Sequence, residues 1–234
     1  MPTYKLILEY DGTNYAGWQR QPNHTSIQSQ LEDALFQISQ ESTTTIASGR
    51  TDAGVHAFAQ VVSFRSGKPL SPGEWTRALN GVLPKDICVR QTEQVSDSFH
   101  ARHNTKCKTY EYRILNHPIR PVLDRFRIWH IPLLLDLGSM KEAADSFKGQ
   151  HNFSSFEGSP TANTNPVCYI RDLDIFQELR VIRMKLTADR FLKQMVRAMV
   201  GTLVEVGQGK RSPSDIKNIP VSYTHLTLPT NREV

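Results

Sequence analysis

The sequence is poor in cysteine and has no long apolar run. Only Cys88, Cys107 and Cys168 occur among its 234 residues, and an odd number without paired spacing is typical of reduced thiols rather than of a disulfide framework. No run of apolar residues approaches the length that spans a membrane, and residues 1–15 lack the pattern of a signal peptide. These absences favour a soluble protein of the cytoplasm.

The chain also lacks a strong excess of either charge. Lys and Arg number 28 and Asp and Glu 23, which gives a formal net charge of +5 and a pI of about 9.2. A moderate basic excess favours an anionic partner such as nucleic acid, although many basic proteins bind none. The length allows one large domain or two small ones, each with a real hydrophobic core.

The first half of the chain alternates between strand and helix patterns. Residues 3–10 alternate in polarity and predict a strand, and capping boxes that begin at Thr25 and Ser71 predict two helices. The order βαββαβ is that of a ferredoxin-like, or split βαβ, unit. The remaining strands of this half are predicted at 43–48, 58–64 and 87–95.

The second half nearly repeats this order. We therefore expect an α+β fold of two ferredoxin-like units, 1–105 and 106–220. A last strand is due after Pro220, but residues 221–234 are a poor match, and we interpret them as a foreign tail. Strands are predicted at 108–115, 125–131, 168–176 and 181–188, and helices around Met140, over 191–206 and from Ser212.

One tight turn combines several polar residues between two predicted strands. Asp52 lies there between Gly49 and Gly54, with Arg50 and His56 beside it. Asp and Gly are common in turns, so a purely structural role is the simpler interpretation of the turn alone. The added arginine and histidine favour a functional site.

Two further patterns suit an anionic ligand. Lys193, Arg197 and Gly201 fall four residues apart on one face of a predicted helix, which is typical of an anion site or of an ordinary solvated face. Tyr110 and Tyr112 alternate on a strand flanked by cations. Such tyrosines stack on nucleic-acid bases or fill a core, and the sequence leaves both open.

Two other patterns carry less weight. The stretch "EYDGTNY" is similar to the D-x-D-G-T motif of aspartyl-phosphate hydrolases, but Glu9 lies at the position where that motif has its nucleophilic Asp. His100, His103 and Cys107 could suggest zinc, but no fourth ligand lies near. We therefore expect no metal site.

Five ordered blocks, spread over residues 3 to about 219, resemble the TruA-type tRNA pseudouridine synthases. The most specific is "GRTDAGVHA" within residues 48–64. The resemblance implies that the two ferredoxin-like halves share a largely antiparallel sheet, with a basic cleft between them. It also implies an enzyme that isomerises uridine to pseudouridine at positions 38, 39 and 40 in the anticodon arm of tRNA, without a cofactor and usually as a homodimer. The other blocks lie at 8–23, 98–114, 147–156 and 191–207.

The resemblance also implies roles for four residues. Asp52 matches the nucleophile, which attacks either uracil C6 or ribose C1′. Arg197 matches the arginine that pairs with this nucleophile. Tyr110 matches the tyrosine that stacks on the target uracil. Arg50 suits the place that an extruded base vacates. The alternative is a non-catalytic RNA-binding or RNA-chaperone protein on the same scaffold, but binding alone does not require a carboxylate among phosphates.

Overall fold

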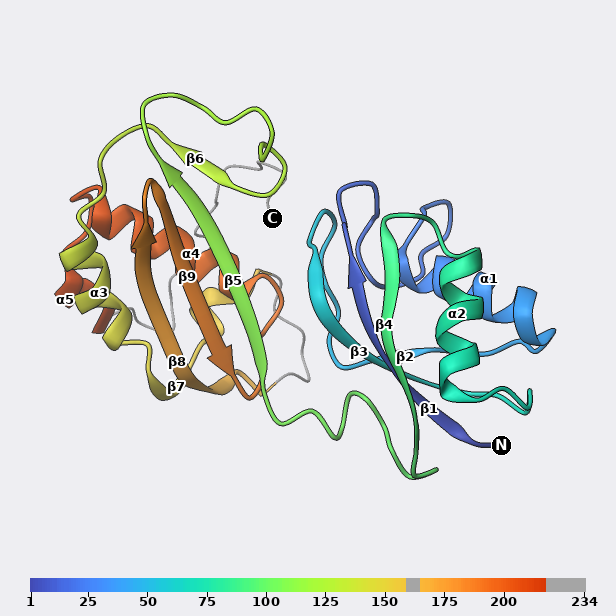
Figure 1. The fold of residues 1–234 in the computed structure, drawn as a ribbon. Helices are drawn as coiled ribbons and strands as arrows, with labels where there is room; N and C mark the ends of the chain where they lie inside the picture. Colours follow the sequence, from blue (N-terminus) through green and yellow to red (C-terminus); the bar gives the residue numbers. More distant parts are fainter. Residues whose placement is uncertain (159–164, 218–234) are drawn as a thin grey trace. The chain divides into compact units, whose positions relative to one another are not determined.

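The computed structural model describes residues 1–158 and 165–217. The chain divides into two compact units, Met1–Thr105 and Lys106–Val234 (Figure 1). In the described part of the chain, each unit has its own sheet and its own hydrophobic core.

The first unit has the predicted βαββαβ order. Its sheet is antiparallel in the order β2-β3-β1-β4, which is the strand order of a ferredoxin-like unit. Both helices lie on one face of this sheet (Figure 1), and Leu6, Leu31 and Trp75 are among the side chains buried between the layers. The elements are β1 (Thr3–Tyr10), α1 (Ile27–Ser39), β2 (Ile46–Ala47), β3 (Ala57–Arg65), α2 (Pro72–Val82) and β4 (Ile87–Val95).

The N-terminus of α1 differs from the prediction by one residue. Ser26, not Thr25, is the N-cap. Its hydroxyl accepts a hydrogen bond from the amide of Ser29, and its amide donates one to the Ser29 hydroxyl. Gln28, which the predicted box used, instead accepts from the Arg20 amide and donates to the Thr45 carbonyl. The α2 cap at Ser71, with Pro72 in the first turn, is confirmed.

The second unit contains a five-stranded sheet in the order β6-β5-β9-β8-β7. The β5–β6 pair is parallel, and the other pairs are antiparallel. The elements are β5 (Lys108–Asn116), β6 (Trp129–Ile131), α3 (Leu137–Asp145), β7 (Gly149–Asn152), a 3₁₀ turn (Ser154–Phe156), β8 (Val167–Glu178), β9 (Val181–Ala188), α4 (Met195–Gly207) and α5 (Pro213–Lys217).

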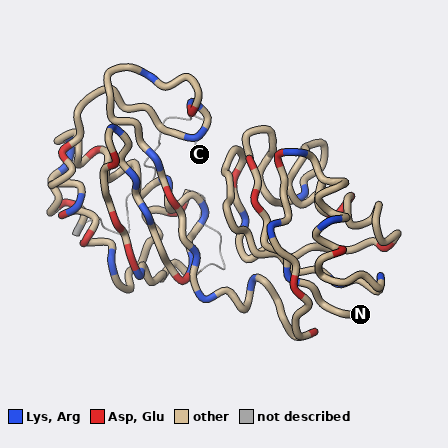
Figure 2. The backbone as a smooth tube through the Cα atoms, viewed as in Figure 1, with Lys and Arg blue, Asp and Glu red and all other residues tan. Residues whose placement is uncertain are grey.

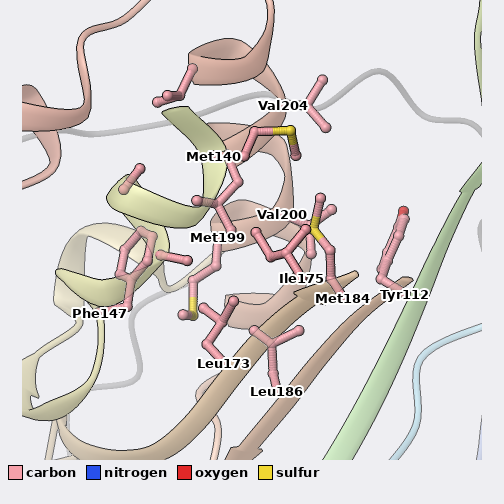
Figure 3. Close-up of a cluster of buried hydrophobic side chains, with 14 of the residues drawn as sticks. Tyr112, Met140, Phe147, Leu173, Ile175, Met184, Leu186, Met199, Val200 and Val204 are labelled. Carbon is pink, nitrogen blue, oxygen red and sulfur yellow. The ribbon is translucent and has the colours of Figure 1, made fainter. Parts of the chain in front are cut away.

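The core of the second unit lies between this sheet and helices α3 and α4. Met140 of α3 and Met199 of α4 both belong to this core and lie above Leu173 and Leu186 of the strands (Figure 3). All four side chains are buried, so the positions of β8, β9 and α4 are fixed by apolar packing.

Helix α4 begins four residues later than predicted. Gln194 has a φ of 58°, which is left-handed, and the helix starts after it. Lys193 therefore lies before the helix, and Gly201 is buried in the core. The prediction that Lys193, Arg197 and Gly201 share one face of the helix is wrong for this reason.

The remaining differences concern short strands. The predicted strands at 43–48 and 125–131 shrink to β2 and β6, and β7 was not expected. The interpretation of 221–234 as a foreign tail concerns residues outside the described ranges. None of the helices in the described ranges is long and apolar enough to cross a lipid bilayer.

The α+β class is confirmed. The further expectation of one shared sheet with a basic cleft stays a prediction. Lys and Arg are interspersed with Asp and Glu in both units, with neither charge segregated to one unit (Figure 2).

Candidate active site

The turn that carries Asp52 joins β2 to β3. Asp52 is exposed, and its carbonyl accepts a hydrogen bond of 3.2 Å from the amide of Val55, which closes the turn. Among the described residues of the first unit, no side chain pairs with the Asp52 carboxylate. The turn therefore presents this carboxylate at the surface of its unit.

A second loop, residues 11–18 between β1 and α1, supports the turn from both sides of Asp52. The Trp18 amide donates to the Thr51 carbonyl at 3.0 Å, and the Gly54 amide donates to the Tyr15 carbonyl at 3.3 Å. The Tyr10 hydroxyl also lies 2.9 Å from the Thr51 hydroxyl. Hydrogen bonds to the residues on either side of Asp52 restrict the conformations that its backbone can adopt.

Two glycines allow the loop to approach the turn this closely. A Cβ on Gly12 would lie 2.0 Å from the carbonyl oxygen of Val55, and one on Gly17 would lie 2.5 Å from that of Thr51. Gly17 also has a φ of +93°, which disfavours any residue with a side chain. The loop and the turn therefore meet backbone to backbone.

The supporting loop is itself anchored to the residue before β4. The Tyr15 hydroxyl donates to the carboxylate of Asp86 at 2.6 Å, and the Asp11 amide donates to the Asp86 carbonyl at 2.9 Å. Burial, followed by the hydrogen bond to Asp86 and the charge of its carboxylate, raises the pKa of Tyr15 above its ordinary value. Trp18 fixes the other end of the loop, because its side chain is buried in the core.

The entry to the turn is held by a glutamine that the sequence did not single out. Gln60 of β3 donates to the carbonyl of Gly49 at 2.6 Å and accepts from the hydroxyl of Ser48 at 2.8 Å. Gln60 is buried. Arg50, the residue after Gly49, remains exposed and lies in the same turn as Asp52.

His56 closes the other end of the turn. Its Nδ1 lies 3.0 Å from Oδ1 of Asp11 and 3.2 Å from the amide nitrogen of Gly12. The sequence placed His56 in the turn but gave it no partner, because Asp11 lies 45 positions earlier in the chain.

Tyr110 and Arg197 both lie in the second unit. Tyr110 is half-buried on β5, opposite Leu186 of β9, and its ring meets Phe191 edge to face at a centroid distance of 5.1 Å. Arg197 is partly buried in the first turn of α4, six positions after Phe191. Tyr112, the other tyrosine of β5 that the sequence singled out, is only 4% exposed and belongs to the core.

The two weaker patterns have ordinary surroundings. Glu9 forms an ion pair with Arg90 across β1 and β4. The rings of His100 and His103 lie 4.1 Å apart, but no three His, Cys, Asp or Glu side chains within 1–158 and 165–217 are grouped to hold a metal ion.

Comparison with known proteins decides the family. A sequence model described as tRNA pseudouridine synthase matches residues 6–104 and 143–224. The chain belongs to the tRNA pseudouridine synthases. It is 42% identical over 219 residues, 94% of this chain and 90% of the relative, to tRNA pseudouridine synthase A 2 of Clostridium perfringens. It is also similar to the tRNA pseudouridine synthases A of Caldicellulosiruptor saccharolyticus (41% over 211 residues, 90% and 86%) and Citrifermentans bemidjiense (41% over 219 residues, 94% and 88%).

These matches confirm the predicted TruA-type family and the enzyme class, an RNA-uridine isomerase that acts on tRNA. The ranges matched by the family model contain the loop 11–18, the Asp52 turn and Arg197, whereas Tyr110 lies between the two ranges. The model match ends at residue 224, four residues into the segment interpreted as foreign.

Proposed function

We propose that this tRNA pseudouridine synthase modifies uridines 38, 39 and 40 in the anticodon arm, with Asp52 as its nucleophile. The observation that carries the proposal is the Asp52 turn itself: the backbone on both sides of this exposed residue is held by hydrogen bonds to a second loop, within a range that the family model matches. A carboxylate that only shaped the turn would not need such support from a second loop.

The isomerisation requires a nucleophile but no redox partner. The bond from ribose C1′ to N1 of uracil breaks, a bond from C1′ to C5 forms, C5 loses its proton and N1 gains one. Atoms and electrons balance within the nucleotide and the solvent. A carboxylate can hold one fragment covalently while the base turns, through attack on C6 or on C1′.

The other three residues act on Asp52 or on the substrate in this proposal. Arg197, as the family resemblance implies, pairs with the Asp52 carboxylate and orients it. Tyr110 stacks on the target uracil, and its ring is already positioned by Phe191. Arg50 occupies the place that the extruded base leaves, or contacts the flanking phosphate.

The decisive experiment follows the C5 proton. We prepare tRNA transcripts labelled with tritium at uridine C5, one set with uridine at positions 38–40 and one with cytidine there. We expect the wild-type enzyme to release tritium from the first set only, without added metal, nucleotide or reductant. Tritium retained by folded protein with several uridine-containing tRNAs would favour a non-catalytic RNA-binding protein.

Asp52→Asn tests the nucleophile in the same assay. We expect turnover to disappear while the affinity for tRNA stays within a few-fold, because phosphate contacts dominate RNA affinity. Asp97→Asn is the matched control, since Asp97 is also an exposed aspartate in a turn of the first unit. Appreciable turnover by Asp52→Asn would show that another group is the nucleophile.

We also propose that the enzyme works as a homodimer in the cytoplasm, as the family resemblance implies. Sedimentation equilibrium with and without tRNA measures the stoichiometry. A monomer at micromolar concentration in both conditions would contradict the dimer.

A further inference from the structure

His56 is the residue of the turn to which the reaction assigns no role. It follows Val55 directly and precedes the first residue of β3. Only 16% of its side chain is exposed, and Nδ1 meets Asp11 and the Gly12 amide at 3.0 and 3.2 Å. This largely buried histidine at the end of the turn therefore contacts the supporting loop through its Nδ1 atom.

Asp11 is oriented before it meets the ring. Its Oδ1 accepts from the amide and the hydroxyl of Thr13, at 3.0 and 2.6 Å, and its amide donates to the carbonyl of Asp86. These contacts fix the carboxylate independently of His56. The ring therefore binds a site that is already in place.

Both protonation states of Nδ1 link the ring to residues 11 and 12. A protonated Nδ1 donates to the Asp11 carboxylate, which can only accept. An unprotonated Nδ1 accepts from the Gly12 amide. The link therefore does not depend on which tautomer the ring adopts.

We infer that His56 and Asp11 form a positioning pair that holds the C-terminal end of the Asp52 turn against the supporting loop. The inference rests on the proposed function, because the pair affects the rate only through the placement of Asp52. His56 itself makes no contact with RNA in this inference. The backbone bonds at Thr51 and Gly54 hold the turn on either side of the nucleophile, and His56 adds a side-chain contact where the turn enters β3. Displacement of a reacting group by about 1 Å can lower a rate roughly 10²-fold.

The test compares two amides that reach different positions of the imidazole ring. In His56→Asn the amide group lies where Nδ1 was and can donate to Asp11 or accept from Gly12. In His56→Gln the amide lies near the place of Nε2 and leaves the Nδ1 position empty. We expect Asn to keep kcat within about 5-fold of wild type and Gln to lower it about 30-fold or more, with KM for tRNA and Tm nearly unchanged in both.

A double-mutant cycle identifies the partner. If Asp11 acts through His56, Asp11→Asn loses less activity in the His56→Gln background than in the wild type. Additive losses, or equal kcat values for His56→Asn and His56→Gln, would overturn the positioning pair.

Hydrogen exchange tests the same inference without any turnover. The amides of Trp18 and Gly54 bridge the loop and the turn, so His56→Gln should speed their exchange about tenfold and His56→Asn should not. The Leu6 amide in the middle of β1 is the internal control and should not change. Unchanged exchange at Trp18 and Gly54 in His56→Gln would refute the pair. The absence of tritium release by the wild type would refute only the proposed function, since the exchange rates decide the pair by themselves.

Discussion

The two regions that carry the candidate site residues are built in different ways. In the first unit, Asp52 lies on a turn that is held by a loop about 40 positions earlier in the chain, through backbone bonds and two glycines. In the second unit, Tyr110 and Arg197 lie on a strand and a helix whose positions follow from sheet pairing and a buried core. The first region depends on backbone contact, and the second depends on side-chain packing.

This difference matters for how much change each region tolerates. Packed cores accept volume-conserving substitutions at a small cost. A backbone-to-backbone contact offers no side chain that can move aside, so an added methyl group must displace the chain itself. We therefore expect the first region to be the less tolerant of substitution.

The largest expected effect is that of alanine at the two contact glycines. In Gly17→Ala the new Cβ would lie 2.5 Å from the Thr51 carbonyl oxygen, at a φ of +93°. In Gly12→Ala it would lie 2.0 Å from that of Val55. We expect each variant to lose roughly 2–4 kcal/mol of unfolding free energy and about 10²-fold or more in turnover, measured by urea denaturation and tritium release.

Gly81→Ala is the matched control for these glycines. Gly81 lies within α2, and a Cβ there would meet no atom within 4 Å. Alanine should stabilise the helix by roughly 0.5–1 kcal/mol and leave turnover unchanged. If Gly17→Ala behaved like Gly81→Ala, the backbone contact would not be what holds the turn.

The next largest effect is expected from Arg197→Lys in the second unit. Lysine keeps the charge but cannot reproduce a planar guanidinium that binds a carboxylate with two nitrogens. Because α4 is fixed by its core, we expect Tm to stay the same while turnover falls about tenfold or more, a loss of roughly 1.4 kcal/mol in transition-state stabilisation. A fall in Tm with unchanged turnover would assign Arg197 to the fold instead.

Much of the fold could be predicted because its signals are local. Alternating polarity gave the bounds of β1, β4 and β9 as the structure has them, and the Ser71 box gave the start of α2. The start of α4 could not be predicted in this way, because the apolar pattern continues through Leu192 although the left-handed Gln194 precedes the helix. Strand β7 contains Gln150, His151 and Asn152, which have no strand periodicity, and it forms by pairing with β8.

The support of the candidate site could not be predicted from local patterns at all. The spacing showed that Asp52, Arg50 and His56 share a turn, but the contacts with Asp11, Gly12 and Tyr15 join distant positions of the chain. The two glycines of "DGTNYAG" were the available signal, since glycine is favoured where two backbones meet closely. Gln60 had no signal, because a buried glutamine in a strand looks like any polar residue of an alternating pattern.

Tyr15→Phe should have a moderate effect that depends on pH. Loss of the hydrogen bond to Asp86 should cost roughly 1–2 kcal/mol at pH 7. In the wild type the pKa of Tyr15 is raised above its ordinary value of about 10. As the pH rises above 10, the unfolded state therefore loses the hydroxyl proton while the folded state still keeps it. The stability that this group contributes is complete below pH 10 and is lost as the pH rises further.

The measurement is Tm between pH 8 and 11 for both proteins. Wild-type Tm should fall more steeply above pH 10 than that of Tyr15→Phe, so that the difference between them narrows. Parallel curves would show that the Tyr15 hydroxyl does not hold the supporting loop in the way that its geometry indicates.

The smallest effect is expected from Tyr110→Phe. The ring keeps its edge-to-face contact with Phe191, so we expect it still to stack on the uracil and the affinity for tRNA to stay within a few-fold. Turnover should lose only what the hydroxyl contributes. We expect that loss to be less than about tenfold, or about 1.4 kcal/mol. Tyr110→Leu removes the ring and should cost more than Phe in both affinity and turnover. Tyr112→Phe is the control on the same strand, where the buried ring belongs to the core and a change should affect Tm rather than turnover. Equal losses for Tyr110→Phe and Tyr110→Leu would mean that the hydroxyl, and not the aromatic face, is what the substrate meets.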